Sequence, residues 1–229
     1  MTRTSTIICV SAAVMLMGGA ARAADPAGIE SPSDWSGAFI GAFAAYSWSD
    51  LDYHEQDWAG FERSPCMQGF SGGPLLGYSC RVSNIVAGLE ADMGFGNLRD
   101  GPSDGPITMN NYSAFKIQRY GHVRARLGFV TGSTLIYFAG GVSLADLIVL
   151  DRDTDPDRAL LWGGDKGTHV GWTAGAGIER PVTEKLRARF EYLHDDYGCN
   201  TYLIDGIDPY RAHVDLSADT LRAGLSYHF

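Results

Sequence analysis

The residues of this sequence that could most readily carry chemistry are charged side chains that recur at every second position of short segments. Glu90 and Asp92 form one such pair, and Arg124 and Arg126 form another. This spacing places both members on one face of a β-strand, because successive side chains of a strand point to opposite sides. Carboxylates and guanidiniums on facing strands could line a path for ions or pair with one another. The full set holds four acids and five arginines: Glu90, Asp92, Arg124, Arg126, Glu179, Arg187, Arg189, Glu191 and Arg222.

Enzyme and metal-site motifs begin in this sequence but lack the residues that their chemistry needs. Residues 175–177 start a glycine-rich loop without its third glycine, and the His-Glu pair at 54–55 has no second histidine four residues later. The acid-rich run 151–157 lacks the glycine and the final glutamate of a calcium-binding loop. His194 with the two aspartates after it is better explained as a solvated loop edge. We therefore predict no enzyme, no metal site and no cofactor.

The N-terminal residues have the order of segments that is typical of a secretory signal peptide. Arg3 precedes an apolar run over 7–17, and small residues lead to Ala23. The run is shorter than the ~20 residues of a spanning helix, although an uncleaved anchor is the alternative. Cleavage after Ala23 leaves 16 basic and 27 acidic residues, a formal charge of −11, which argues against nucleic acid as a partner. We predict a signal peptide over 1–23, a periplasmic leader over 24–34 and an outer-membrane β-barrel over 35–229.

The last ten residues, 220–229, alternate between apolar and polar or small side chains. Leu225, Tyr227 and Phe229 share one face, whereas Arg222 lies on the other. In a transmembrane β-barrel, about nine to eleven tilted residues cross the hydrocarbon layer, with apolar side chains toward lipid and polar ones inward. The terminal segment has the pattern of such a strand.

The N-terminal strand of the predicted barrel provides a more specific signal. It opens Trp35-Ser-Gly-Ala-Phe-Ile-Gly41 and ends Tyr46-Ser-Trp48. This pattern resembles the small eight-stranded, porin-like outer-membrane proteins and surface antigens of alphaproteobacteria. The resemblance implies an all-β fold, an eight-stranded antiparallel up-and-down transmembrane β-barrel in the cell outer membrane, and a monomer. The segments that resemble the other seven strands are 69–78, 86–92, 121–128, 137–142, 171–179, 186–197 and 220–229.

The connections between these segments alternate between short and long, as in bacterial barrels with short periplasmic turns and long external loops. Tight turns are predicted at 81–84, 131–133 and 181–185. The predicted external loops are 49–68, 97–118, 146–169 and 198–213.

Pro74 falls inside the second strand, where a missing N–H donor predicts a bulge or weak pairing.

Alternation alone leaves a soluble secreted β-barrel binding protein open, because the charged face could then lie in solvent. In the membrane barrel the charges face a lumen that is just wide enough for side chains. We therefore predict that they form an ion-pair network that plugs the interior. The protein would be structural, contributing to envelope integrity and the cell surface. The alternative is a porin-like, narrow diffusion channel for small solutes.

The resemblance also implies partners. Relatives of this kind contact outer-membrane lipid and lipopolysaccharide, and the barrel-assembly machinery reads their C-terminal strand, here Leu225, Tyr227 and Phe229.

Removal of the signal peptide leaves three cysteines. About 14 residues of strand, at ~3.3 Å each, separate Cys66 from Cys80, far beyond the ~7 Å that a disulfide spans. Because barrel closure makes the first and fourth external loops neighbours, we predict a disulfide between Cys66 and Cys199.

Overall fold

The computed structural model describes residues 35–55, 62–63, 66–100, 111–153, 162–204 and 210–229. The predicted signal peptide and leader lie outside these residues. All regular structure within them is β-strand. They contain no helix that is long and apolar enough to cross a membrane.

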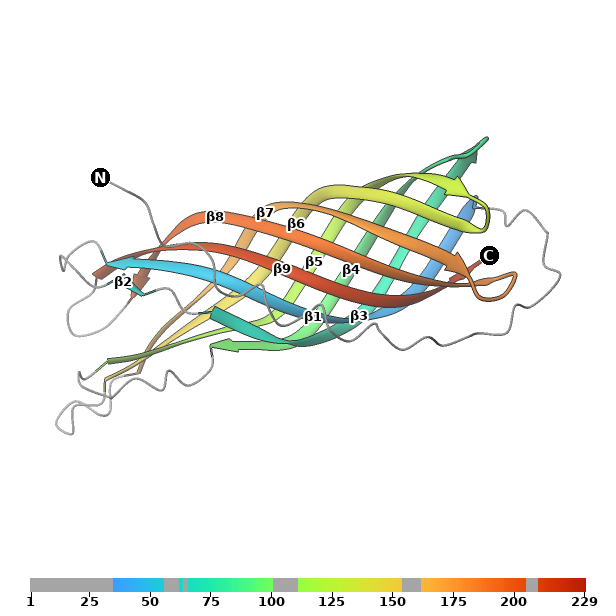
Figure 1. Ribbon diagram of the computed structural model, residues 1–229. Helices are drawn as coiled ribbons and strands as arrows, with labels where there is room; N and C mark the ends of the chain where they lie inside the picture. The colour runs from blue at the N-terminus through green and yellow to red at the C-terminus, as the bar shows by residue number, and fades with distance from the viewer. Residues whose placement is uncertain (1–34, 56–61, 64–65, 101–110, 154–161, 205–209) are drawn as a thin grey trace, which may run out of the picture. The chain divides into compact units, whose positions relative to one another are not determined.

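Eight long strands form one antiparallel sheet that closes on itself, which confirms the predicted eight-stranded barrel (Figure 1). The order is β1-β3-β4-β5-β6-β7-β8-β9, and the pairing of β1 with β9 closes the ring. The two-residue strand β2 pairs only with the far end of β1. The strands are β1 (Gly37–Glu55), β2 (Glu62–Arg63), β3 (Cys66–Val82), β4 (Ile85–Asp100), β5 (Asn111–Thr131), β6 (Thr134–Asp153), β7 (Trp162–Pro181), β8 (Leu186–Ile204) and β9 (Tyr210–His228).

The three predicted tight turns are confirmed, and they define the periplasmic end of the barrel. Ser83 and Gly132 adopt positive φ angles of 59° and 58°, which let the chain reverse within two residues. The four long connections are shorter than predicted, because the strands continue into them. The long strands have 16 to 21 residues, more than the about nine to eleven that cross the hydrocarbon layer. The ladders therefore extend past the apolar band at the outer end.

Pro74 weakens one ladder without shifting its register. It pairs with Ala42 of β1, but it forms no pair with β4. In the β3–β4 ladder, the pair of Gly72 with Phe95 is followed directly by the pair of Leu75 with Asp92. The predicted weak pairing is confirmed, and no bulge accompanies it.

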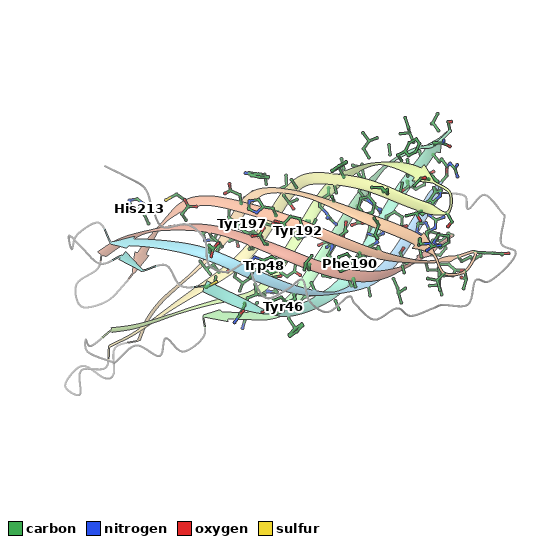
Figure 2. All side chains as sticks on the ribbon, in the orientation of Figure 1. Tyr46, Trp48, Phe190, Tyr192, Tyr197 and His213 are labelled. Carbon is green, nitrogen blue, oxygen red and sulfur yellow. The ribbon has the colours of Figure 1, made fainter. Side chains whose placement is uncertain are left out.

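Apolar side chains cover the outside of the barrel and charges fill its inside. Leu89, Val123 and Phe138 point outward and are 65%, 60% and 71% exposed. Aromatic side chains join them on the outer half, including Tyr46 of β1 and Tyr192 of β8 (Figure 2). A soluble barrel would bury its apolar face, so the soluble alternative is wrong.

The predicted disulfide between Cys66 and Cys199 is also wrong. Both cysteines lie in strands instead of loops: Cys66 pairs with Asp50 of β1, and Cys199 pairs with Asp215 of β9. Two strands, β1 and β9, therefore stand between them. Three strand spacings of about 4.8 Å exceed the ~7 Å between α-carbons that a disulfide allows. The Cys66 thiol instead lies 3.9 Å from the Asp50 carboxylate.

Candidate functional site in the barrel lumen

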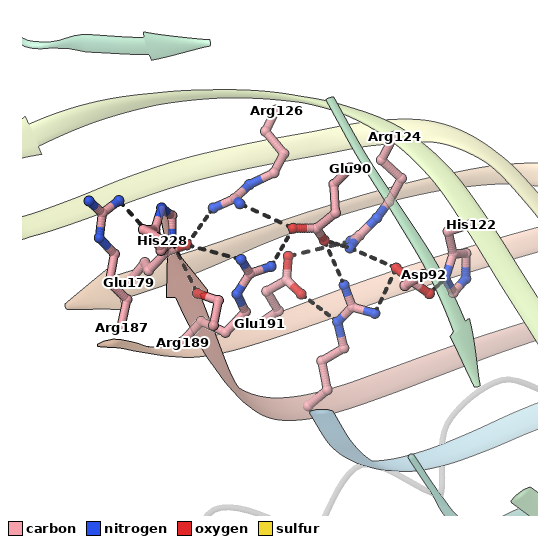
Figure 3. A network of polar contacts seen from close by, with 12 residues as sticks. Glu90, Asp92, His122, Arg124, Arg126, Glu179, Arg187, Arg189, Glu191 and His228 are labelled. Carbon is pink, nitrogen blue, oxygen red and sulfur yellow. Dashed lines mark hydrogen bonds and ion pairs between the residues drawn. The ribbon is translucent and has the colours of Figure 1, made fainter. Parts of the chain in front are cut away.

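All nine predicted charged residues point into the lumen, as the alternation of their strands requires. None is more than 9% exposed. Their side chains meet in one continuous network that spans the middle of the barrel (Figure 3). The members are Glu90, Asp92, Arg124, Arg126, Glu179, Arg187, Arg189, Glu191 and Arg222.

Glu90 of β4 is the centre of the network and contacts four arginines. Its Oε1 lies 2.5 Å from Nη2 of Arg124 and 3.2 Å from Nη2 of Arg222. Its Oε2 lies 3.1 Å from Nη1 of Arg126 and also accepts a hydrogen bond from Arg189. Arg189 is on β8, four places from β4 in the ring of eight. This contact therefore joins opposite walls of the barrel.

A second group of contacts lies toward the outer end. Arg222 of β9 donates to Glu191 through Nε and to Asp92 through Nη1, the latter at 3.0 Å. Arg124 of β5 contacts the same two acids, at 3.1 Å to Asp92 and 3.4 Å to Glu191. Two guanidiniums therefore bridge the same two carboxylates from different walls.

A third group lies toward the periplasmic end around Glu179 of β7. Arg126 donates to it at 2.7 Å, and Arg189 lies 3.4 Å away. Arg187 lies 3.9 Å from the same carboxylate. His228 Nε2 is 3.5 Å from it.

Sequence reasoning missed one acid of the network, Asp195. The cluster of His194 with its two following aspartates separates in the structure, because neighbouring residues of a strand point to opposite sides. His194 turns outward and lies 2.9 Å from Asp219, whereas Asp195 turns inward and is 3% exposed. There it lies 3.2 Å from Nε2 of His122, whose Nδ1 is 2.7 Å from Asp92. The signal was available, since position 195 continues the alternation of Arg187, Arg189 and Glu191.

Inward aromatic rings, which the charge pattern does not reveal, support the arginines. Arg126 stacks over Tyr137 at 4.0 Å, and Arg187 stacks over Trp35 at 4.2 Å. Such contacts stabilise a desolvated guanidinium. Glycines provide the space: a Cβ on Gly177 would lie 2.6 Å from the Tyr137 ring.

Apolar layers close the lumen above and below the charges. The outer layer includes Met67, Leu147 and Leu216, each 0% exposed. The periplasmic layer surrounds Trp35, which precedes β1 and is 1% exposed. A cavity of about 10 Å³, roughly the space of one water, lies between the network and the outer layer. Between the two apolar layers, the lumen is therefore filled with side chains of the described residues.

The charges of the network are matched and connect several walls of the barrel. In the part of the lumen that the structure describes, five acids, including Asp195, face five arginines, so their formal charges balance. His122 sits between two carboxylates, as a proton-transfer residue can, but it is 3% exposed and lies beneath the apolar layer. Glu90, Asp92, Glu179 and Glu191 instead each meet partners from two or more strands, as buried charges require, and Asp195 meets His122 of β5.

A closed antiparallel barrel with an apolar outside and a charged, packed inside defines the class as a transmembrane β-barrel of the outer membrane. Residues 10–229 match the family described as outer membrane protein beta-barrel domain, and the chain belongs to this family. It is a protein of the outer membrane.

Relatives with similar sequences support the same class. The chain is 29% identical to the 31 kDa outer-membrane immunogenic protein of Brucella melitensis over 204 residues, which are 85% of this chain and 84% of the relative. It is 28% identical to the 22 kDa outer membrane protein of Rhizobium leguminosarum, over 80% of this chain and 74% of the relative. It is 25% identical to the 25 kDa outer-membrane immunogenic protein of Brucella abortus, over 98% of both chains.

Among solved structures, the outer membrane protein OprG of Pseudomonas aeruginosa is similar in fold. The TM-score is 0.53 at 14% sequence identity, and the match covers 85% of this chain and 97% of OprG. At this identity the likeness concerns the fold alone.

Proposed function

We propose that the protein is a structural, non-conducting barrel that contributes to the integrity of the outer membrane and carries its external loops to the cell surface. The observation that supports this proposal is the filled lumen. Glu90 and its four arginine partners occupy the centre, and apolar layers cover them on both sides.

The ion pairs serve this function because they connect strands that are not neighbours in the sheet. Ladder hydrogen bonds hold each strand to the next one only. The contact of Arg189 with Glu90 joins β8 to β4, and that of Arg124 with Glu191 joins β5 to β8. A barrel crossed by such contacts resists flattening and opening, which is the mechanical property that a wall component needs.

A porin-like diffusion channel is the rival function. It needs a continuous column of water through the lumen. Here the ion-pair network and the two apolar layers, on three levels of the lumen, stand in the way of such a column. The narrow interior of an eight-stranded barrel gives the same expectation.

We further propose contacts at the surface and during assembly. Two relatives are named immunogenic outer-membrane proteins, which supports surface exposure of the external loops in this protein as well. The outward band, with Tyr46, Trp48 and Tyr192 on its outer half, would lie against lipopolysaccharide. The outward residues Leu225, Tyr227 and Phe229 of the terminal strand would be read by the barrel-assembly machinery. We propose no catalytic role and no cofactor.

A deletion strain tests the function in the cell. The strain should become more sensitive to detergents and to large antibiotics that an intact outer membrane excludes. The unmodified gene should restore resistance, and a variant with a weakened network, Glu90→Gln, should restore it only in part. Unchanged resistance together with slower uptake of small solutes would favour the porin instead.

A further inference from the structure

The ladder between β7 and β8 ends halfway along the barrel, although both strands continue. Its last pair toward the outer end joins Trp172 to Asp196. Beyond it, β7 extends to Trp162 and β8 to Ile204, each still paired on its other side, with β6 and with β9. In Figure 1, β8 and β9 continue toward one side of this end and β5 and β6 toward the other. Among the described strands, this is the seam where two long strands part.

The β8 edge of this seam is not protected in the usual way, and the β7 edge carries only one charge of each sign. Exposed strand edges normally carry charges or prolines that block pairing with another chain. Residues 198–204 contain neither, and they are rich in residues that favour strands. Residues 162–168 contain one acid and one base, so their formal charge is zero. The two edges therefore carry no net formal charge, although the chain as a whole has a formal charge of −9.

Strand direction restricts what can pair with both edges. β7 runs toward the periplasmic turns and β8 runs away from them, so one extended peptide between them would be parallel to one edge. A second barrel in the same membrane avoids this problem. A two-fold axis along the membrane normal places β7 of each copy beside β8 of the other, and both new pairs are antiparallel.

We propose that the seam between β7 and β8 is a dimer interface, at which two copies of this chain exchange strand pairing above the membrane. Each outer edge of β7 pairs with the outer edge of β8 from the partner subunit. Below the seam, β7 presents the small outward residues Ala174 and Ala176 between the larger outward side chains of Trp172 and Ile178. This assembly replaces the monomer that the resemblance implied, and it leaves the closed lumen unchanged.

The pairing predicts a specific cysteine contact. β8 has one extra residue relative to β9 between Asp196 and Cys199. If the β7–β8 register continues past this bulge between copies, Cys199 lies opposite Val170 of the partner subunit. Both side chains point outward, and Val170 is 63% exposed. A cysteine at position 170 would then meet Cys199 across the interface.

The test is oxidative cross-linking in native outer membranes. The variant Val170→Cys is made with Cys66→Ser and Cys80→Ser, and a copper–phenanthroline oxidant is added. Leu144→Cys in the same background is the matched control, because Leu144 is directly opposite Val170 on β6, and β6 is paired on both sides. We expect a covalent dimer from Val170→Cys at a yield at least tenfold above that of Leu144→Cys.

Three results would overturn the proposal. A disulfide within one chain would mean that the seam closes inside a single barrel. Equal dimer yields from both variants would mean random collision, and no cross-link from a variant that keeps the gel mobility of a folded barrel would mean an open seam. Light scattering of the unmodified protein in mild detergent gives an independent reading: twice the mass of one chain is expected, and the mass of one chain contradicts the dimer. Neither experiment depends on whether the lumen conducts.

Discussion

Neutralising Glu90 should destabilise the barrel more than any surface change, because four guanidiniums converge on this one carboxylate. We take the variant Glu90→Gln, which keeps the shape of the side chain and removes its charge. At an effective dielectric constant near 20, a pair of unit charges about 4 Å apart attracts by about 4 kcal/mol. Glu90 makes four contacts of this kind, with Arg124, Arg126, Arg189 and Arg222. Repulsion among the arginines and the desolvation of the carboxylate offset most of that sum.

The net effect on the free energy of unfolding should be a loss of about 3–5 kcal/mol, the usual result of removing one partner of a buried charge pair. Equilibrium unfolding in urea, with the protein in lipid vesicles, measures it. Glu184→Gln is the control, because Glu184 lies exposed on the turn before β8 and its loss should change stability by about 0.5 kcal/mol or less. A loss below about 1 kcal/mol for Glu90→Gln would refute the view that the network holds the walls together.

Three further changes test other parts of the structure. Ala125→Arg places a charge on the outward face of β5 near the middle of the apolar band and should cost about 2–4 kcal/mol in vesicles, whereas an unchanged urea midpoint would mean that this face does not meet lipid. Trp35→Ala should cost about 3–5 kcal/mol, because it empties the periplasmic layer beneath Arg187; a loss under 1 kcal/mol would place the ring outside the packed core. Deletion of Phe229 should block assembly, which fractionation of membranes would detect, and normal amounts of the truncated barrel in the outer membrane would make this residue dispensable.

The inward charges could be predicted from the sequence because their strands alternate cleanly. Glu90 and Asp92 stand between apolar residues, so a period of two separates the face toward lipid from the face toward the lumen. The same rule would have placed Asp195 inside, had the strand been extended past Glu191. The strand ends were harder to predict, because ladder pairing continues beyond the apolar band, where composition changes to that of a loop.

The partners of the charges could not be predicted from the sequence. Arg189 meets Glu90 across the lumen, 99 residues away in the chain and four strands away in the ring. Alternation gives the face of a residue but neither its height in the tilted barrel nor the opposite wall that it reaches. The supporting rings were hidden for another reason. The buried ring of Phe39, for example, lies 5.3 Å from the guanidinium of Arg189, but its strand is apolar on both faces, so the alternation does not distinguish its inward face from its outward face. The failed pairing of Cys66 with Cys199 likewise reflects heights and strand spacings around the closed ring.

The most direct test of the central claim is the conductance of the purified barrel in a planar lipid bilayer. If the luminal ion pairs and the two apolar layers fill the interior, no continuous water column forms, and the unmodified protein should show no steady current in 1 M KCl. Glu90→Gln, which leaves the arginines with one carboxylate fewer, should show more frequent leak events. Large, stable open-state currents from the unmodified protein would contradict the account and identify the luminal charges as the lining of a channel.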